Sequence, residues 1–120
     1  MTLLSNLAKQ NLSSIFNQRD RKKRRAALRE LWAADGVLWT ADGTYVGYSA
    51  VERAAASVLR RYPEFDFSPS GDIDEIPDAA RMHWALGTAG TPPAVTGLDV
   101  IVVSDGRIVA MYRFLNGAEL

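Results

Sequence analysis

Two residues that could move a proton, His83 and Asp99, lie on neighbouring predicted strands. His83 is the single histidine of the sequence and lies in a predicted strand from Ala79 to Gly87, whereas Asp99 lies in one from Val95 to Ser104. A carboxylate beside an imidazole orients the ring and favours its protonated form, so the two side chains could act as a general acid/base pair. The alternative is a surface or interface hydrogen bond.

Arg113 is the second candidate for chemistry. It lies in the last predicted strand, Arg107 to Asn116, on the same face as Met111 and Leu115. A guanidinium in an apolar cavity is costly to desolvate, so it needs a protein carboxylate or an anionic ligand as its partner. Arg113 could therefore anchor the carboxylate of a small hydrophobic acid. Alternatively, it lies at a cavity mouth and extends into water.

Aromatic and hydroxyl side chains supply further candidates for a binding site. Thr40 and Tyr45 could donate hydrogen bonds to a ligand, with backbone or water partners as the alternative. The aromatic residues could line a pocket for an aromatic or polycyclic ligand, although core packing is the alternative for each. They are Trp32, Trp39, Tyr45, Tyr62, Phe65, Phe67 and Trp84.

Composition excludes several classes of protein. The 120 residues, 48% of them hydrophobic, suffice for one core, so we expect a single domain over residues 1–120. The absence of cysteine excludes disulfides, thiolate metal sites and a cysteine nucleophile. We expect no metal and no cofactor, since one histidine without a clustered set of carboxylates makes a poor zinc site. Without an apolar run of ~20 residues or a secretory signal, we expect a cytoplasmic protein without membrane spans.

The balanced charge, 14 cationic and 14 acidic residues, conceals an asymmetry. Residues 1–30 carry a net +6, much of it in the run from Arg19 to Arg25, and the rest of the chain carries −6. This run could bind phosphate or anionic lipid. Because no aromatic residues interrupt it, nucleic-acid binding is not expected, and a solvated helix face opposite an acidic body is the alternative.

Periodicity predicts helices early in the chain and strands late. Apolar residues recur at helical spacing over Leu4 to Phe16 and again from Leu28 to Trp32, with Asp20 as the expected N-cap of the second helix. A third helix is predicted from a Ser49 to Glu52 capping box, and Pro63 should end it. A hairpin around Asp42-Gly43 comes between the second and third helices. Further strands are predicted over Phe65 to Ser68, Ala79 to Gly87, Val95 to Ser104 and Arg107 to Asn116. This order indicates an α+β fold with helices on one face of a mostly antiparallel sheet.

Several segments together resemble the nuclear transport factor 2-like superfamily, and small bacterial SnoaL-like proteins in particular. They are Trp32-Ala-Ala-Asp-Gly36, Gly47 before the third helix, Arg81 to Gly87, Gly97 to Val100, Asp105 to Ile108 and Tyr112 to Leu115. The resemblance covers roughly residues 8 to 116. It implies a cystatin-like roll, in which a cone-shaped, curved sheet wraps around three helices and encloses an apolar cavity. Relatives use this cavity for isomerisation, cyclisation, epoxide hydrolysis, dehydration or binding alone.

The resemblance also provides a test for ketosteroid isomerase activity. Catalysis in those enzymes depends on a carboxylate base, an oxyanion-hole tyrosine, a second tyrosine and a protonated aspartate. The matching positions here hold Thr40, Phe16, Ala55 and Val102. Proton abstraction beside a carbonyl needs a base and an oxyanion donor, so this activity is not expected. In the similar limonene epoxide hydrolases a catalytic aspartate occupies the position of Arg113, which reverses the local charge.

Strand alternation predicts which side chains face the cavity. On the Ala79 to Gly87 strand the apolar set, Met82, Trp84 and Leu86, should point inward. Matching to the family puts Leu98, Val100 and Val102 inward and leaves Asp99 with His83 on the outer face. In SnoaL-like cyclases a histidine and an aspartate on successive late strands carry out acid/base catalysis. For His83 and Asp99 to do the same, both side chains would have to face the cavity, opposite to the parity predicted here. The residues expected to bind the ligand are Phe16, Trp32, Thr40, Tyr45, Val58, Met82, Trp84, Leu98, Val100, Val102, Met111 and Arg113.

The same parity predicts an apolar outer face that a homodimer would cover. Its expected residues are Ala85, Ile101, Val103, Ile108, Tyr112 and Phe114. The expected function is binding of a small hydrophobic organic molecule, either neutral or anionic. The first alternative is a cofactor-free isomerase, cyclase or hydratase, with His83 and Asp99 as conditional catalytic residues. The second is a protein interaction module with a closed cavity.

Overall fold

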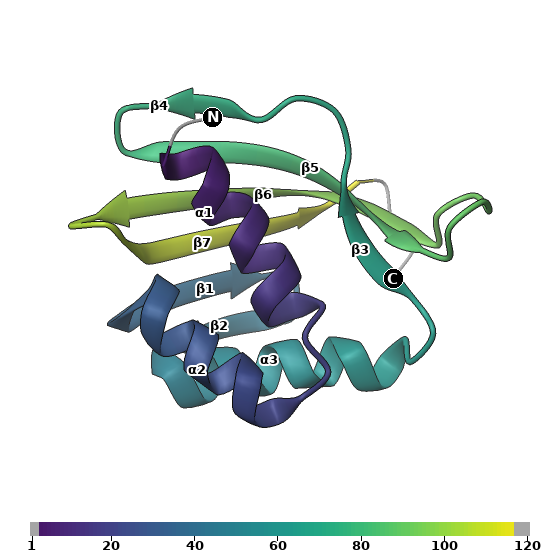
Figure 1. Cartoon of the computed structure of the whole chain (residues 1–120), viewed down its shortest axis with the longest axis horizontal. Coiled ribbons are helices and arrows are strands. Elements are labelled where there is room, and N and C mark those ends of the chain that lie inside the picture. Colours follow the sequence, from purple (N-terminus) through teal and green to yellow (C-terminus); the bar gives the residue numbers. More distant parts are fainter. Residues whose placement is uncertain (1–2, 117–120) are drawn as a thin grey trace.

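Residues 3–116 are described by a computed structural model, in which three helical regions lie against one curved sheet (Figure 1). Helix α1 (Leu3–Asn11) continues into a short π-helix, η1 (Leu12–Phe16), and is followed by α2 (Arg21–Leu31) and α3 (Gly47–Arg61). The strands are β1 (Trp32–Thr40), β2 (Gly43–Val46), β3 (Asp66–Pro69), β4 (Asp74–Ile76), β5 (Ala79–Gly87), β6 (Val95–Ser104) and β7 (Arg107–Leu115).

The sheet has the strand order β2-β1-β7-β6-β5-β3, and β4 also pairs with β5. Strands β1 and β7 run parallel, and the other pairings are antiparallel. The helices all lie on the same, concave side of the sheet (Figure 1). This arrangement confirms the predicted α+β fold, because helices with one apolar stripe must bury that stripe against the apolar face of the sheet.

Local sequence signals explain several boundaries. The Asp20 carboxylate accepts hydrogen bonds from the backbone N–H groups of Lys22 and Lys23 at 2.9 and 3.2 Å, so it is the N-cap of α2, as predicted. The β6–β7 turn has positive φ angles at Asp105 and Gly106, 52° and 76°, which gives the twist that a tight hairpin requires. Tyr62 is the C-cap of α3, which ends before Pro63 as predicted.

Two predicted boundaries were wrong. Helix α3 begins at Gly47, whose φ of 86° suits glycine, and no side chain caps its first turn. The Ser49 to Glu52 capping box does not form, because the Glu52 carboxylate bonds to the guanidinium of Arg24 at 2.6 and 2.9 Å instead. Trp32 starts β1 rather than ending α2. Strand β4 was not predicted, since a three-residue edge strand carries little periodicity.

The core lies between the helices and the concave face of the sheet. Its largest fully buried side chains include Trp32, Trp84 and Phe16. In the part of the chain that the structure describes, no helix is both long and apolar enough to cross a membrane. The same part contains no cluster of three histidine or acidic side chains that could hold a metal ion.

Candidate functional site

A pocket of about 510 Å³ opens between α3, η1 and the concave face of the sheet. Most of its wall is apolar, and the polar side chains come from β1, the β1–β2 turn, β2, β7 and the end of α3. The lining residues are Phe16, Leu38, Thr40, Ala41, Asp42, Tyr45, Ala54, Val58, Arg61, Tyr62, Phe67, Trp84, Leu86, Val95, Arg113 and Leu115. An apolar concavity with a few polar groups is the usual form of a small-molecule site.

An ion pair between Arg113 and Asp99 lies at this pocket. The Arg113 Nε and Nη2 atoms donate to the two Asp99 carboxylate oxygens at 2.8 and 2.9 Å, and Trp84 Nε1 donates to Oδ1 at 2.8 Å. Asp99 is 2% exposed and Arg113 is 8% exposed. Arg113 therefore has a protein carboxylate as its partner, one of the two partners that its position on β7 predicted.

One nitrogen of Arg113 is left for a ligand. Among residues 3–116, Nη1 has no hydrogen-bond partner, and no fully buried side-chain nitrogen or oxygen lacks one. Nη1 is therefore not completely buried, and Arg113 lines the pocket. This N–H group can donate a hydrogen bond to an oxygen atom of a bound molecule.

Three aromatic rings fix the Arg113 guanidinium. Its Cζ atom lies 4.1, 4.8 and 5.1 Å from the ring centroids of Phe16, Phe67 and Trp84. The negative faces of such rings attract a cation. Gly97 on β6 makes room for Trp84, because a Cβ atom at residue 97 would collide with the indole ring. The surrounding rings and the paired carboxylate together hold the guanidinium in one orientation.

The rim of the pocket combines polar and charged groups. The Thr40 hydroxyl accepts from the Asp42 N–H at 3.1 Å and contacts the Gly43 carbonyl at 3.4 Å, so it serves the β1–β2 turn. The Tyr45 hydroxyl has no hydrogen-bond partner within residues 3–116 and lies in the pocket wall. Unlike the hydroxyl of Thr40, that of Tyr45 is thus available to a ligand.

Arg61 is a lining residue that sequence reasoning missed. It is exposed in the last turn of α3 and shares a helix face with Ala54 and Val58, which also line the pocket. The spacing of four and then three residues along this helix is the signal that could have found it.

Half of the predicted ligand-binding residues line the pocket, and the others lie elsewhere. Phe16, Thr40, Tyr45, Val58, Trp84 and Arg113 contribute to its wall. Trp32, Met82 and Met111 are fully buried in the core, where Trp32 Nε1 donates to Asn11 Oδ1 at 2.8 Å. Leu98, Val100 and Val102 are half-buried on the outer face of the sheet.

The predicted parity of β5 is confirmed, and that of β6 was wrong. Met82, Trp84 and Leu86 are buried. On β6, however, Asp99 and Ile101 point inward, because Met82 pairs with Asp99 across the β5–β6 ladder and paired residues share a face. Both faces of β6 carry branched apolar residues, so hydrophobicity alone did not reveal which face is buried. The burial of Asp99 depends on Arg113, its partner on β7.

The predicted sharing of one face by His83 and Asp99 was therefore also wrong. His83 is exposed on the outer face and pairs with Leu98, whereas Asp99 is buried on the inner face. Adjacent strands bring the two backbones close, but the pleat directs the two side chains to opposite sides. No imidazole–carboxylate pair forms between them.

The apolar outer face differs from the predicted set. Ile101 and Ile108 are buried in the core, at 1% and 0% exposure, because the parity of β6 is reversed and a bulge shifts the β6–β7 register between Val102 and Val103. The exposed outer face carries Tyr112 and Phe114, as predicted, together with Trp39. Trp39 and Tyr112 stack with ring centroids 4.7 Å apart. We call Trp39, Tyr112 and Phe114, with half-buried Leu98, Val100 and Val102, the outer patch.

The family model for the SnoaL-like domain matches residues 11–111 of this chain. The chain belongs to the SnoaL-like family. No curated protein is similar enough in sequence to match it. The predicted resemblance is thereby confirmed at the level of the family.

Solved structures show the same fold as this SnoaL-like protein. A candidate isomerase of the SnoaL-like family from Agrobacterium tumefaciens has a TM-score of 0.89 at 23% identity and covers 98% of this chain and 100% of its own. A candidate SnoaL-like polyketide cyclase from Jannaschia sp. has a TM-score of 0.78 at 14% identity, covering 95% and 85%. An NTF2-like protein of unknown function from Mesorhizobium loti has a TM-score of 0.72 at 22% identity, covering 96% and 92%. At these identities the similarity establishes the shared fold.

The four positions matched to ketosteroid isomerases do not form one polar site. Phe16 and Thr40 line the pocket, Ala55 is buried in the core and Val102 is half-buried on the outer face. None of the four side chains is a carboxylate or a phenol. The buried ion pair at the pocket, Arg113–Asp99, comes from two other positions.

Proposed function

We propose that this SnoaL-like protein binds a small, mostly hydrophobic organic molecule in the pocket, with an acceptor oxygen of the ligand on Arg113 Nη1. The single observation that supports the proposal is a guanidinium N–H without a protein partner in a mostly apolar pocket of about 510 Å³. The open pocket also favours binding over an interaction module with a closed cavity.

The ligand need not be an anion. Because the Asp99 carboxylate neutralises the Arg113 guanidinium, the pair brings no net charge to the pocket. A ketone or hydroxyl oxygen can accept the remaining hydrogen bond, and a carboxylate gains less from Arg113 than it would from an unpaired cation. Arg61 at the rim is a separate cation that an anionic substituent could reach.

Calorimetric titration with three probes of one shape tests this proposal: indane, 1-indanone and indane-1-carboxylate. We expect 1-indanone to bind roughly three- to tenfold more tightly than indane, as one hydrogen bond contributes about 1 kcal/mol. The carboxylate should exceed the ketone by less than about tenfold, since Asp99 already pairs with Arg113. Equal affinity for indane and 1-indanone would contradict the role of Nη1.

Blocking the pocket supplies the matched control. Ala54→Trp places an indole in the pocket wall and should abolish binding of all three probes. Ser57→Trp adds the same side chain to an exposed position of the same helix, outside the lining, and should leave affinity unchanged. Undiminished binding by the folded Ala54→Trp protein would show that the pocket is not the site.

A cofactor-free isomerase, cyclase or hydratase is the second candidate, which the inward carboxylate of Asp99 beside Arg113 supports. His83 has no part in it, because its side chain is on the outer face. Exchange of the α-protons of 1-indanone in deuterated water, followed by NMR, tests proton abstraction. Catalysed exchange that disappears with Asp99→Asn would support this candidate, and exchange at the buffer rate would oppose it.

We further propose a two-fold homodimer through the outer patch. Phe114 is 54% exposed, and Trp39 and Tyr112 add further accessible aromatic surface. Burial of such a patch is favourable at about 25 cal/mol per Å². We expect the protein to be a dimer by light scattering and Phe114→Glu to weaken dimerisation at least about tenfold. Ser57→Glu, the same charge change on exposed α3, is the control, and a monomeric unaltered protein would contradict the proposal.

A further inference from the structure

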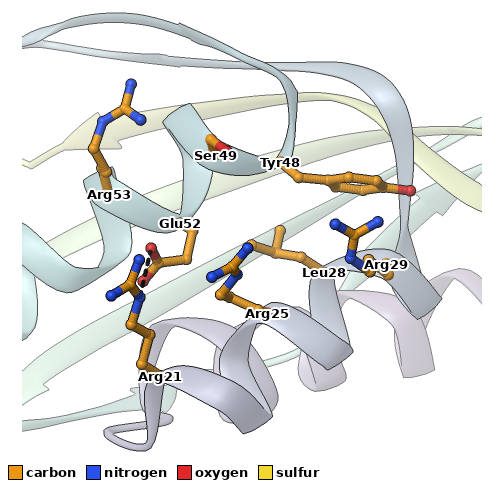
Figure 2. A pocket seen from close by; sticks show the side chains of 8 residues that line it. All are labelled: Arg21, Arg25, Leu28, Arg29, Tyr48, Ser49, Glu52 and Arg53. Carbon is orange, nitrogen blue, oxygen red and sulfur yellow. Dashed lines mark ion pairs between the residues drawn. The ribbon is translucent and has the colours of Figure 1, made fainter.

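A groove between the outer sides of α2 and α3 carries a concentration of arginines that the pocket does not use. Arg21, Arg25 and Arg29 follow one another along α2 and face α3, from which Arg53 extends (Figure 2). These four side chains are exposed, and Arg60 continues the cationic lining along α3. We call the space between these five residues the arginine groove.

The charge of the arginine groove is compensated only in part by the protein. Glu52 is the one carboxylate that lines it among the described residues, and it is bonded to the buried guanidinium of Arg24 at 2.6 Å. Arg21 lies 3.8 Å from the other Glu52 oxygen. With Arg24 and Glu52 cancelling, the five exposed guanidinium groups leave a local charge near +5.

This arrangement has a cost that a bound anion would remove. Like charges four residues apart on a helix destabilise it by about 0.2–0.5 kcal/mol for each pair, and Arg21, Arg25 and Arg29 form two such pairs. Arg29 is also held in place, with its Cζ atom 5.2 Å from the centroid of the Tyr48 ring. The guanidinium groups thus remain on one side of α2 despite their mutual repulsion.

The shape of the groove indicates the size of the anion. One compartment of about 120 Å³ lies against Arg25, Arg29, Tyr48 and Ser49, and a second of about 270 Å³ lies against Arg24, Ala56 and Arg60. Both share Arg21, Glu52 and Arg53. Two small adjacent compartments suit two neighbouring anionic groups rather than a long polymer. Planar guanidinium forks match the several oxygens of a phosphate.

We propose that the arginine groove binds a diphosphate, or two neighbouring phosphate groups of a small ligand. This site is separate from the pocket, because Arg53, Ala56 and Arg60 of α3 line the groove whereas Ala54, Val58 and Arg61 line the pocket. The proposal for the arginine groove is therefore independent of the proposed function of the pocket.

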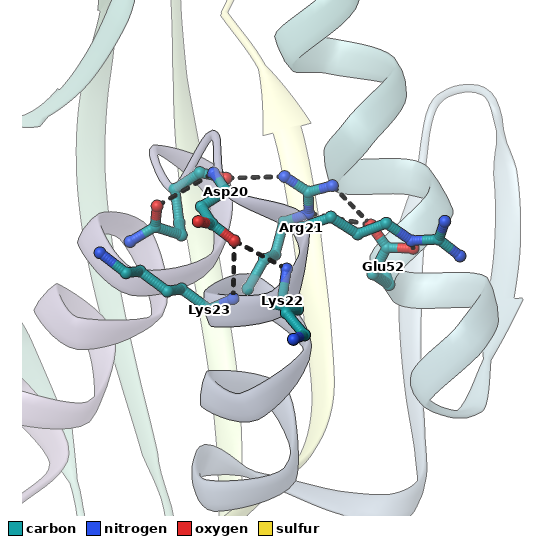
Figure 3. A network of polar contacts seen from close by, with 7 residues as sticks. Asp20, Arg21, Lys22, Lys23 and Glu52 are labelled. Atoms are coloured by element: carbon teal, nitrogen blue, oxygen red, sulfur yellow. Dashed lines mark hydrogen bonds and ion pairs between the residues drawn. The ribbon is translucent and has the colours of Figure 1, made fainter.

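Two exposed lysines on the same helix provide a matched control. Lys22 and Lys23 do not line the groove, and their side chains do not point toward Glu52 (Figure 3). The double variant Lys22→Gln with Lys23→Gln removes two positive charges, the same number as the double variant Arg25→Gln with Arg53→Gln. All four side chains are exposed, so both double variants should keep the fold, which circular dichroism and a thermal melt would verify.

The test is calorimetric titration of the full chain with pyrophosphate, inorganic phosphate and malonate at constant ionic strength. We expect pyrophosphate to bind most tightly, Arg25→Gln with Arg53→Gln to lower its affinity at least tenfold, and the lysine variant to lower it less than threefold. If both double variants lose the same affinity for pyrophosphate, binding depends on the overall positive charge of the helix rather than on the arginine groove, and the proposed site is wrong. Absence of pyrophosphate binding, or malonate binding as tight, would overturn the phosphate assignment.

A vesicle assay separates soluble from lipid phosphate as the source. Phosphatidylcholine vesicles, with and without phosphatidic acid, are sedimented with the protein. We expect no co-sedimentation, because the compartments lie recessed between two helices. Co-sedimentation that depends on phosphatidic acid and is abolished by Arg25→Gln with Arg53→Gln would contradict the soluble ligand and assign the site to a lipid headgroup.

Discussion

Arg113→Met is expected to destabilise the protein by about 3–5 kcal/mol, because it leaves the Asp99 carboxylate buried without its counter-charge. Asp99 is 2% exposed, and its remaining partner would be Trp84 Nε1. The side chain lost also contacts three aromatic rings, so packing adds to the electrostatic effect. Urea unfolding followed by circular dichroism measures the change in the free energy of unfolding.

The double variant Arg113→Met with Asp99→Asn distinguishes an orphaned charge from lost packing. The amide oxygen at residue 99 can still accept from Trp84 Nε1, and no charge remains to be desolvated. We expect at least about 2 kcal/mol of the loss to be recovered. If the single and double variants are equally destabilised, the ion pair does not govern stability at this site. For ligand binding, this means that Arg113 variants are interpretable only with Asp99 changed as well.

The second large effect is expected at the Arg24–Glu52 pair, which joins α2 to α3. Arg24 is 5% exposed and Glu52 is 6% exposed, and Arg24 also donates to the Gln18 carbonyl at 2.7 Å. Glu52→Ala leaves a buried guanidinium with one backbone acceptor and should cost about 3–5 kcal/mol in unfolding free energy. Chemical denaturation provides the measurement.

Glu64→Ala is the matched control for this prediction, since it removes an exposed glutamate just beyond the end of α3. Its effect should be within about 0.5 kcal/mol. Replacing both partners, Arg24→Met with Glu52→Leu, should restore most of the stability, because two apolar side chains need no compensating charge. A Glu52→Ala protein as stable as the Glu64→Ala protein would refute the role of the pair in holding α2 against α3.

Strand positions with a clear contrast between faces were predictable from sequence, and those without one were not. On β5 the apolar residues Met82, Trp84 and Leu86 alternate with Arg81 and His83. This pattern predicts one buried face, and the structure has that face buried. On β6 apolar residues occur on both faces of the strand, so the sequence pattern does not distinguish which face is buried. Parity there depends on pairing with β5 and on Arg113, which compensates the buried charge of Asp99.

Capping was predictable only where the cap is local. Asp20 accepts from backbone N–H groups two and three residues away, so the sequence motif contains both partners. The Ser49 to Glu52 motif has the right spacing but fails, because Glu52 is engaged by Arg24, 28 residues earlier in the chain. A strong long-range ion pair outcompetes a weak local cap.

From the sequence alone came the α+β class and the order of most helices and strands. These features depend on periodicity and turn chemistry within a few residues of each position. Only the tertiary structure decided that Asp99 is the partner of Arg113, that His83 lies on the other side of the sheet and that five arginines line one groove. The physical reason is that these relations join residues far apart in the chain, and strand register and helix packing determine which of them meet.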